Sequence, residues 1–183
     1  MDHYIEIKLT PDTEMRGNFL LNIVYTKLHK ALFDLNNKSI GISFPDYEVL
    51  LGRRIRLHGT TADLEKLQSL NWLGSLLEYC EVHSIKKVPK KVQYRVISRK
   101  RTKMDQSNLN RLIKRGSIKP EEIKSYKAKM FSRGLDNPYV ELVSNSNGNR
   151  HRHYLEFSEL QSTPVEGEFN HFGVSRSGTI PWF

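Results

Sequence analysis

Residues 20–35, LLNIVYTKLHKALFDL, hold the pattern that decides the fold. Apolar side chains recur there in steps of three and four, which predicts an amphipathic helix from about residue 14 to residue 35. Before this helix, Ile5, Ile7 and Leu9 alternate with polar residues, as in a strand that buries one face. The helical stripe consists of Leu21, Val24, Leu28, Ala31, Leu32 and Leu35.

Strand and helix signals continue to residue 86. Apolar alternation returns at residues 40–44 and 55–57, and turn residues bound each of these strands. A second helix is predicted to begin with Thr60 or Thr61 as its cap. Residues 79–86 predict a last strand. The order is β-α-β-β-α-β, so we predict an α+β protein whose first part is a ferredoxin-like domain. Many functions occur on that fold, so it gives architecture only.

The positive charge is concentrated in one stretch of the chain. The 183 residues include 29 Lys or Arg and 20 Asp or Glu, a net charge of +9. Residues 86–115, the basic segment, contain one acid, Asp105, and carry a charge of +11. Solubility does not need cations segregated to this degree, so we predict a surface for nucleic acid. The cations are Lys86, Lys87, Lys90, Lys91, Arg95, Arg99, Lys100, Arg101, Lys103, Arg111, Lys114 and Arg115.

Composition changes beyond Pro89, and we expect a domain boundary near residue 94. The predicted domains are residues 1–94, the ferredoxin-like domain, and residues 95–183, an RNA-binding domain. Within the second domain, residues 105–115 predict a helix with Asp105 as its cap and Gly116 as its stop. Its cations at positions 111, 114 and 115 then share one face.

The rest of the second domain predicts a helix and a β-hairpin. Pro120 and two following acids are typical of a helix start. Residues 139–143 and 153–157 read as strands, and the loop 144–149 between them contains Asn-Gly, a strong hairpin signal. The apolar end, Pro181-Trp182-Phe183, suggests that the last residues are packed against the domain.

Several functional classes lack their sequence signals. The chain has no phosphate-binding loop, paired cysteines, His-Glu-x-x-His or dinucleotide fingerprint, so we expect no cofactor. His151 and His153 could share a metal on one strand face, but no carboxylate or cysteine stands at ligand spacing, so we predict no metal. A single cysteine, Cys80, an acidic N-terminus and no long apolar stretch predict a soluble, cytoplasmic protein without membrane contact.

Two polar features remain open on residue chemistry alone. His29 lies in the last turns of the first helix between Lys27 and Lys30, where a half-buried surface histidine is more common than a catalyst. The loop 144–149 is also typical of a simple turn, since serine and asparagine satisfy their own backbone there.

Several separated motifs, which occur in order from the first residues to the last, favour a functional role for His29 and the loop 144–149. Together they resemble the type I-F CRISPR repeat endoribonuclease family over the whole chain. The motifs are Met1-Asp2-His3-Tyr4, Lys27-Leu28-His29, Phe44-Pro45-Asp46, Ser98-Arg99, the basic helix, Ser144-x-Ser146-x-Gly148, Phe172-Gly173-Val174-Ser175 and Pro181-Trp182-Phe183.

The resemblance implies a hairpin of CRISPR repeat RNA as the ligand. Arg111, Lys114 and Arg115 match an arginine-rich helix that enters the major groove of the stem, which is accessible because a short stem ends in an open loop. Arg99 matches an arginine that reads a guanine, a task that suits a guanidinium. Arg101 stands where a glutamine is expected, and His151 where relatives stack an aromatic ring on the terminal base pair. Lys103 and Ser146 are further candidate RNA contacts.

The resemblance also implies metal-free RNA cleavage. A histidine, with an ordinary pKa of about 6.5, can remove the proton of an RNA 2′-hydroxyl at neutral pH. His29 takes that role, Ser144 holds the hydroxyl, and Phe172 replaces a tyrosine beside the histidine. Attack within the substrate leaves a 2′,3′-cyclic phosphate and a 5′-hydroxyl, so DNA is not cut. The family stays on its product and caps the crRNA-guided surveillance complex.

Two alternatives compete with this prediction. A non-catalytic RNA-hairpin-binding subunit of a ribonucleoprotein complex would use the same basic segment and fold, and incubation with hairpin RNA separates the two. A DNA-binding regulator would need a helix-turn-helix or a dimer seam, and the sequence has neither.

Overall fold

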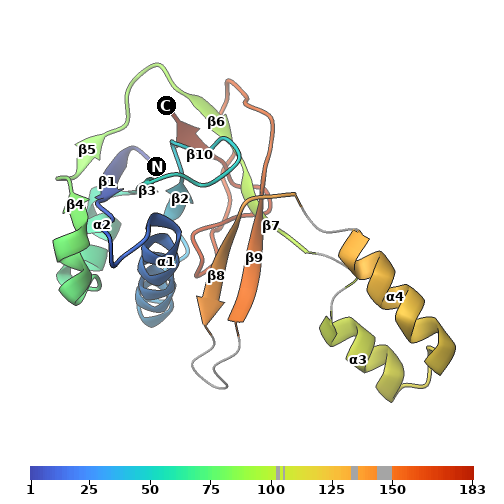
Figure 1. Cartoon of the computed structure of the whole chain (residues 1–183). Helices are drawn as coiled ribbons and strands as arrows, with labels where there is room; N and C mark the ends of the chain where they lie inside the picture. Colours follow the sequence, from blue (N-terminus) through green and yellow to red (C-terminus); the bar gives the residue numbers. More distant parts are fainter. Residues whose placement is uncertain (102–103, 105, 133–135, 144–149) are drawn as a thin grey trace. The chain divides into compact units, whose positions relative to one another are not determined.

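The computed structural model describes the whole chain except residues 102–103, 105, 133–135 and 144–149. It combines helices with antiparallel strands, so the α+β prediction is confirmed (Figure 1). The described elements are β1 (His3–Leu9), α1 (Gly17–Asp34), β2 (Gly41–Ser43), β3 (Arg54–Gly59), α2 (Thr61–Ser69), the 3₁₀ helix η1 (Gly74–Tyr79), β4 (Cys80–Val82), β5 (Lys86–Lys87), β6 (Gln93–Arg95), β7 (Ile97–Lys100), α3 (Gln106–Lys114), α4 (Pro120–Ser132), β8 (Tyr139–Val143), β9 (Arg150–Phe157) and β10 (Ile180–Trp182).

The chain divides into two compact units. The main unit comprises Met1–Arg99 and Pro138–Phe183, and the helical unit comprises Lys100–Asn137. The predicted boundary near residue 94 stays a prediction, because compactness does not show which segments fold independently. Among the described residues, no helix is both long and apolar enough to cross a membrane.

A five-stranded sheet in the main unit carries the predicted β-α-β-β-α-β order. Its strands lie in the order β2-β3-β1-β4, and β5 also pairs with β1. Ile5 pairs with Leu57 and Ile7 with Ile55 across the β1–β3 ladder, and all four side chains are buried. The apolar alternation of the sequence is therefore the inward face of this sheet. Thr60 caps α2, as predicted, by accepting a backbone N–H three residues along the chain.

The last strand of this sheet, predicted over residues 79–86, is instead two short strands. β4 pairs Val82 with Ile7, whereas β5 pairs Lys86 with Tyr4. Between these pairs, three residues at 83–85 lie opposite two residues of β1. The extra residue forms a bulge that shifts the register and interrupts the ladder.

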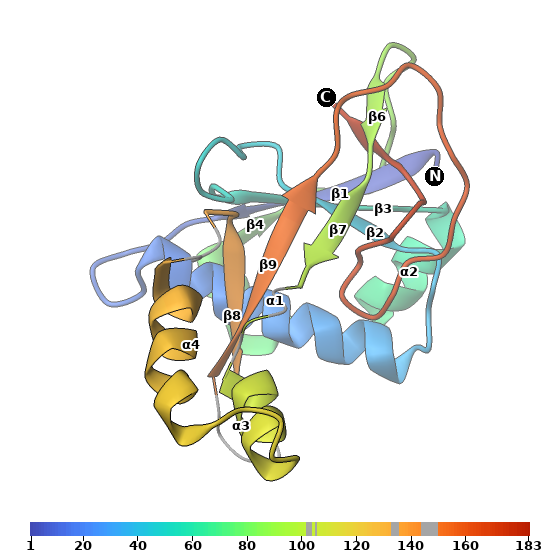
Figure 2. The same ribbon diagram turned by 90° about the vertical axis from the view of Figure 1, so that its right-hand side faces the viewer.

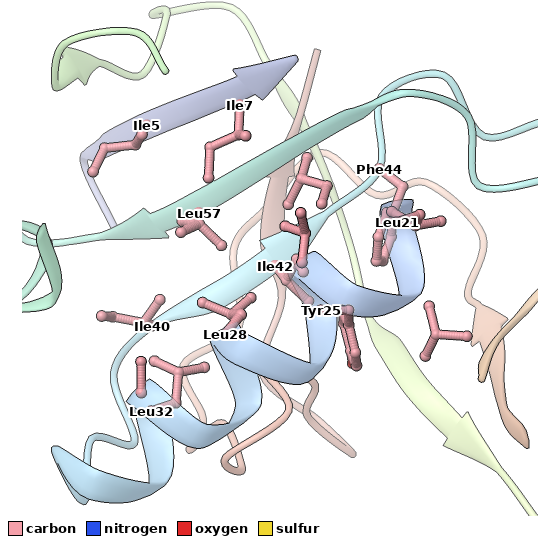
Figure 3. Close-up of a cluster of buried hydrophobic side chains, with 14 of the residues drawn as sticks. Ile5, Ile7, Leu21, Tyr25, Leu28, Leu32, Ile40, Ile42, Phe44 and Leu57 are labelled. Atoms are coloured by element: carbon pink, nitrogen blue, oxygen red, sulfur yellow. The ribbon is translucent and has the colours of Figure 1, made fainter. Parts of the chain in front are cut away.

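Helix α1 begins at Gly17 rather than near residue 14. The side chain of Asp12 accepts the backbone N–H groups of Glu14 and Met15, at 2.9 and 2.7 Å. These bonds hold residues 12–15 in a turn that competes with the helix. The predicted apolar stripe lies against the sheet, and Tyr25 is buried with it (Figure 3).

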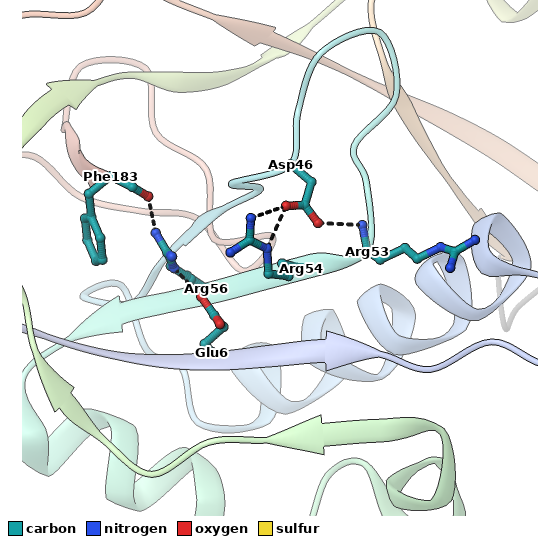
Figure 4. A network of polar contacts seen from close by, with 6 residues as sticks. All are labelled: Glu6, Asp46, Arg53, Arg54, Arg56 and Phe183. Carbon is teal, nitrogen blue, oxygen red and sulfur yellow. Dashed lines mark hydrogen bonds and ion pairs between the residues drawn. The ribbon is translucent and has the colours of Figure 1, made fainter.

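A second sheet of the main unit joins the predicted hairpin to β7, in the order β7-β9-β8 (Figure 2). It packs on α1, where the side-chain oxygen of Asn22 accepts the backbone N–H of Glu141 at 2.9 Å. Near the chain end, β10 pairs with β6. Arg56 donates to Glu6 and to the carbonyl oxygen of Phe183 (Figure 4). The apolar end is therefore packed, as predicted.

The helical unit contains α3 and α4. The predicted stop of α3 is confirmed, because Gly116 has φ +65° and donates its N–H to Ile113 at 3.0 Å. Asp105, the predicted cap, lies outside the described residues. Helix α4 begins at Pro120 as predicted, and Asn108 of α3 donates to the Tyr126 hydroxyl of α4 at 3.2 Å.

Candidate active site

His29 is held by a backbone carbonyl from the other end of the sequence. It lies half-buried on α1, and its Nδ1 is 3.0 Å from the carbonyl oxygen of His171. A carbonyl oxygen can only accept, so this bond places the hydrogen on Nδ1. In the neutral ring the lone pair is then on Nε2, which can accept a proton from a substrate.

The ring of Phe172 fixes the plane of that imidazole. The His29 and Phe172 rings are stacked, with centroids 3.8 Å apart and planes 9° from parallel. The buried His153 of β9 also contacts Phe172, at 4.4 Å between centroids. Phe172 therefore contacts two histidine rings, and its own ring restricts the rotamer of His29 by contact area.

The turn Asn170–Gly173, which presents the carbonyl and the ring, has a tightly specified backbone. Asn170 accepts the N–H of Phe172 through its side chain and that of Gly173 through its carbonyl, both at 2.8 Å. Gly173 has φ +70°, and a Cβ there would lie 3.0 Å from Ile42. Its own carbonyl accepts the N–H of Ile42 at 2.9 Å. Glycine at 173 thus lets the turn approach β2 closely.

Tyr25 ties the same turn to α1. Its hydroxyl donates to the carbonyl oxygen of Phe172 at 2.8 Å, and its side chain is 1% exposed. Burial raises the pKa of this phenol well above its ordinary value, while the charge of Arg99 opposes the shift. The phenol therefore stays protonated and remains a donor at neutral pH.

Arg99 and His151, both predicted RNA contacts, are exposed on β7 and β9 of the main unit. The position of His151 is two residues before His153, so the two side chains share one face of β9. That face is buried at His153 and exposed at His151. Ser144, Ser146 and Lys103 lie outside the described residues, so their predicted roles stay predictions.

The helical unit carries the predicted cationic face. Arg111 and Lys114 are exposed on α3, and Arg115 follows directly, with its N–H bonded to the carbonyl of Arg111 at 3.1 Å. Leu109, on α3 itself, is fully buried. Arg101 is also exposed. Guanidinium and ammonium groups grouped in this way can neutralise several phosphates of one strand.

Comparison with known proteins decides the family. A family model described as "CRISPR-associated protein (Cas_Csy4)" matches residues 4–183. The chain belongs to the Cas6/Csy4 family. A relative named "CRISPR-associated endonuclease Cas6/Csy4" from Escherichia coli (strain UTI89 / UPEC) is 35% identical over 184 residues, covering all of both chains. One with the same name from Pseudomonas aeruginosa (strain UCBPP-PA14) is 36% identical over 187 residues, again covering all of both chains. The resemblance that the motifs indicate is confirmed.

Three parts of the site in this Cas6/Csy4 protein are missing from the sequence-based prediction. Tyr25 stands four residues before His29, so the predicted helix places both side chains on one face, and this spacing could have identified Tyr25 as a neighbour of the site. His153 stands two residues after His151, and a histidine pair on a strand suggests a metal before it suggests ring packing. The carbonyl of His171 belongs to the backbone, and every residue type has one, so the sequence gives no sign of its role.

Proposed function

We propose that this Cas6/Csy4 protein is a metal-independent endoribonuclease that cuts CRISPR precursor RNA at the 3′ base of the repeat hairpin and stays bound to the product. The observation that carries the proposal is the bond from Nδ1 of His29 to the carbonyl of His171, which leaves Nε2 as the base. The names of the two relatives, both endonucleases, support the activity.

In the proposed reaction, Nε2 of His29 takes the proton of the 2′-hydroxyl before the scissile phosphate. The O2′–P bond forms while the P–O5′ bond breaks, the departing 5′ oxygen takes up a proton from water, and the His29 imidazolium returns its proton to the solvent. The products are a 2′,3′-cyclic phosphate and a 5′-hydroxyl. Ser144 orients the nucleophile, because a displacement of about 1 Å can cost about 10²-fold in rate.

RNA recognition is divided between the two units. In the helical unit, Arg111, Lys114 and Arg115 bind phosphates of the stem, with Arg101 and Lys103 as further contacts. In the main unit, Arg99 reads a guanine, His151 stacks on the terminal base pair, and Ser146 contacts RNA. The strand order β2-β3-β1-β4, with a helix after β1 and after β3, supports a ferredoxin-like domain. The first helix of that domain carries His29.

Neutralising one cation of α3 tests the phosphate role. We expect Arg111→Gln, Lys114→Gln and Arg115→Gln each to weaken binding equally across stem sequences and to lower the slope of log K against log salt by about one. Titrations of the uncut hairpin at several salt concentrations measure this. Lys129→Gln, a lysine in the last turn of α4, is the matched control in the same unit. A loss confined to one stem sequence would assign the residue to base reading.

Changing Phe172 tests whether ring packing suffices at this position. Phe172→Tyr keeps the ring that stacks on His29 and the bond from Nδ1 to the His171 carbonyl, so we expect it to change the single-turnover rate by less than about tenfold. Phe172→Ala should cost more, because it removes the stacked ring and frees His29. A large gain with tyrosine would show that a hydroxyl at 172 is needed.

Incubation of the protein with repeat RNA and with an unrelated hairpin of equal length tests the activity itself. We expect a single cut in the repeat RNA and none in the other. A stable complex with intact repeat RNA would instead favour the non-catalytic RNA-hairpin-binding subunit.

A further inference from the structure

His29 and Tyr25 are one helical turn apart on α1, and both donate to the turn Asn170–Gly173. They reach consecutive carbonyls: Nδ1 of His29 bonds to His171, and the hydroxyl of Tyr25 bonds to Phe172. Side chains four residues apart on a helix lie on the same face, so one face of α1 donates hydrogen bonds to two adjacent peptide carbonyls.

We propose that Tyr25 is a positioning residue whose hydroxyl keeps the His171 carbonyl and the Phe172 ring in place against His29. This inference rests on the proposed function of His29 as the base. Through the turn, the hydroxyl controls how the imidazole is oriented and which of its nitrogens carries the hydrogen.

The surrounding contacts explain why the Tyr25 hydroxyl can hold the turn Asn170–Gly173 in position. The bonds to Asn170 set the shape of the turn, and the bond from Ile42 ties it to β2. The bond from Tyr25 ties it to α1, the helix that carries His29. Tyr25 is packed in the core beside Phe44, with ring centroids 6.3 Å apart (Figure 3). A side chain fixed in this way donates along one direction, so it limits movement of the turn along α1.

Loss of the hydroxyl leaves a polar atom without its partner. In Tyr25→Phe the ring still fills its place in the core, while the Phe172 carbonyl loses the hydrogen bond that it accepts at 2.8 Å. An unmatched carbonyl favours a shifted turn in which another donor or water reaches it. The adjacent carbonyl of His171 moves with it, and the bond that fixes the tautomer of His29 weakens.

The test compares Tyr25→Phe with Tyr47→Phe in the full chain. Tyr47→Phe is the matched control, because it also removes one phenol hydroxyl, from a ring that stacks on Phe157 at 3.8 Å. For each variant we measure the single-turnover cleavage rate, the affinity for uncut repeat hairpin, and the ¹⁵N resonances of the His29 ring. We expect Tyr25→Phe to cut about tenfold more slowly with affinity within about twofold of normal. The His29 resonances should move toward a mixture of tautomers, and Tyr47→Phe should leave all three unchanged.

The outcomes separate this inference from the proposed function. Normal cleavage and unchanged His29 resonances in Tyr25→Phe would overturn the positioning role and leave the function of His29 intact. A slower rate with unchanged resonances would also overturn it, since the hydroxyl would then act by another route. If the unmodified protein cut no RNA, the proposed function would fail, and the resonances would still report whether Tyr25 fixes the His29 tautomer.

Discussion

The variant His29→Ala is expected to bind the repeat hairpin within a few-fold of the normal affinity and to cut it at least about 10³-fold more slowly, as expected for the loss of a general base. The imidazole acts on a proton that moves only in the transition state, so its removal costs little in ground-state binding. Single-turnover cleavage and titration of a non-cleavable hairpin measure the two effects separately.

A second histidine provides the control for this experiment. His83 follows β4 in the same unit and contacts Glu81 at 3.2 Å, so His83→Ala removes an imidazole without touching the turn Asn170–Gly173. We expect its cleavage rate to be normal. A loss of affinity in His29→Ala as large as its loss of rate would assign His29 to RNA binding and contradict its role as the base.

The second large effect concerns the substrate. Repeat RNA with a single 2′-deoxy nucleotide immediately before the scissile phosphate should bind normally and show no detectable cleavage, because the attacking oxygen is absent. The same substitution one nucleotide further along the strand is the control, and that RNA should be cut at the normal rate. Cleavage of the first substrate would mean that water attacks the phosphate.

Short-range patterns predict most of the elements of the fold correctly. The alternation at Ile5 and Ile7, the stripe on α1 and the cap at Thr60 each depend on neighbours in sequence, and the structure contains all three. The start of α1 and the last strand of the sheet differ from prediction. In both places a local hydrogen bond or an extra residue competes with the periodic pattern.

The geometry of the site depends on contacts that no local pattern encodes. The bond that orients His29 joins residues 142 positions apart and ends on a backbone atom. The hydroxyl of Tyr25 reaches across 147 positions to another carbonyl. Residue types therefore identify His29 as a candidate, but only the packed turn specifies which nitrogen can act as the base.

The most direct test of metal-free attack by the 2′-hydroxyl is the chemistry of the cut ends. Repeat RNA is incubated with the protein in an excess of chelator, and both product ends are determined by mass spectrometry. The proposed mechanism predicts an undiminished rate, a 2′,3′-cyclic phosphate on the upstream product and a 5′-hydroxyl on the downstream product. A 3′-hydroxyl with a 5′-phosphate, or a rate that chelation abolishes, would contradict it.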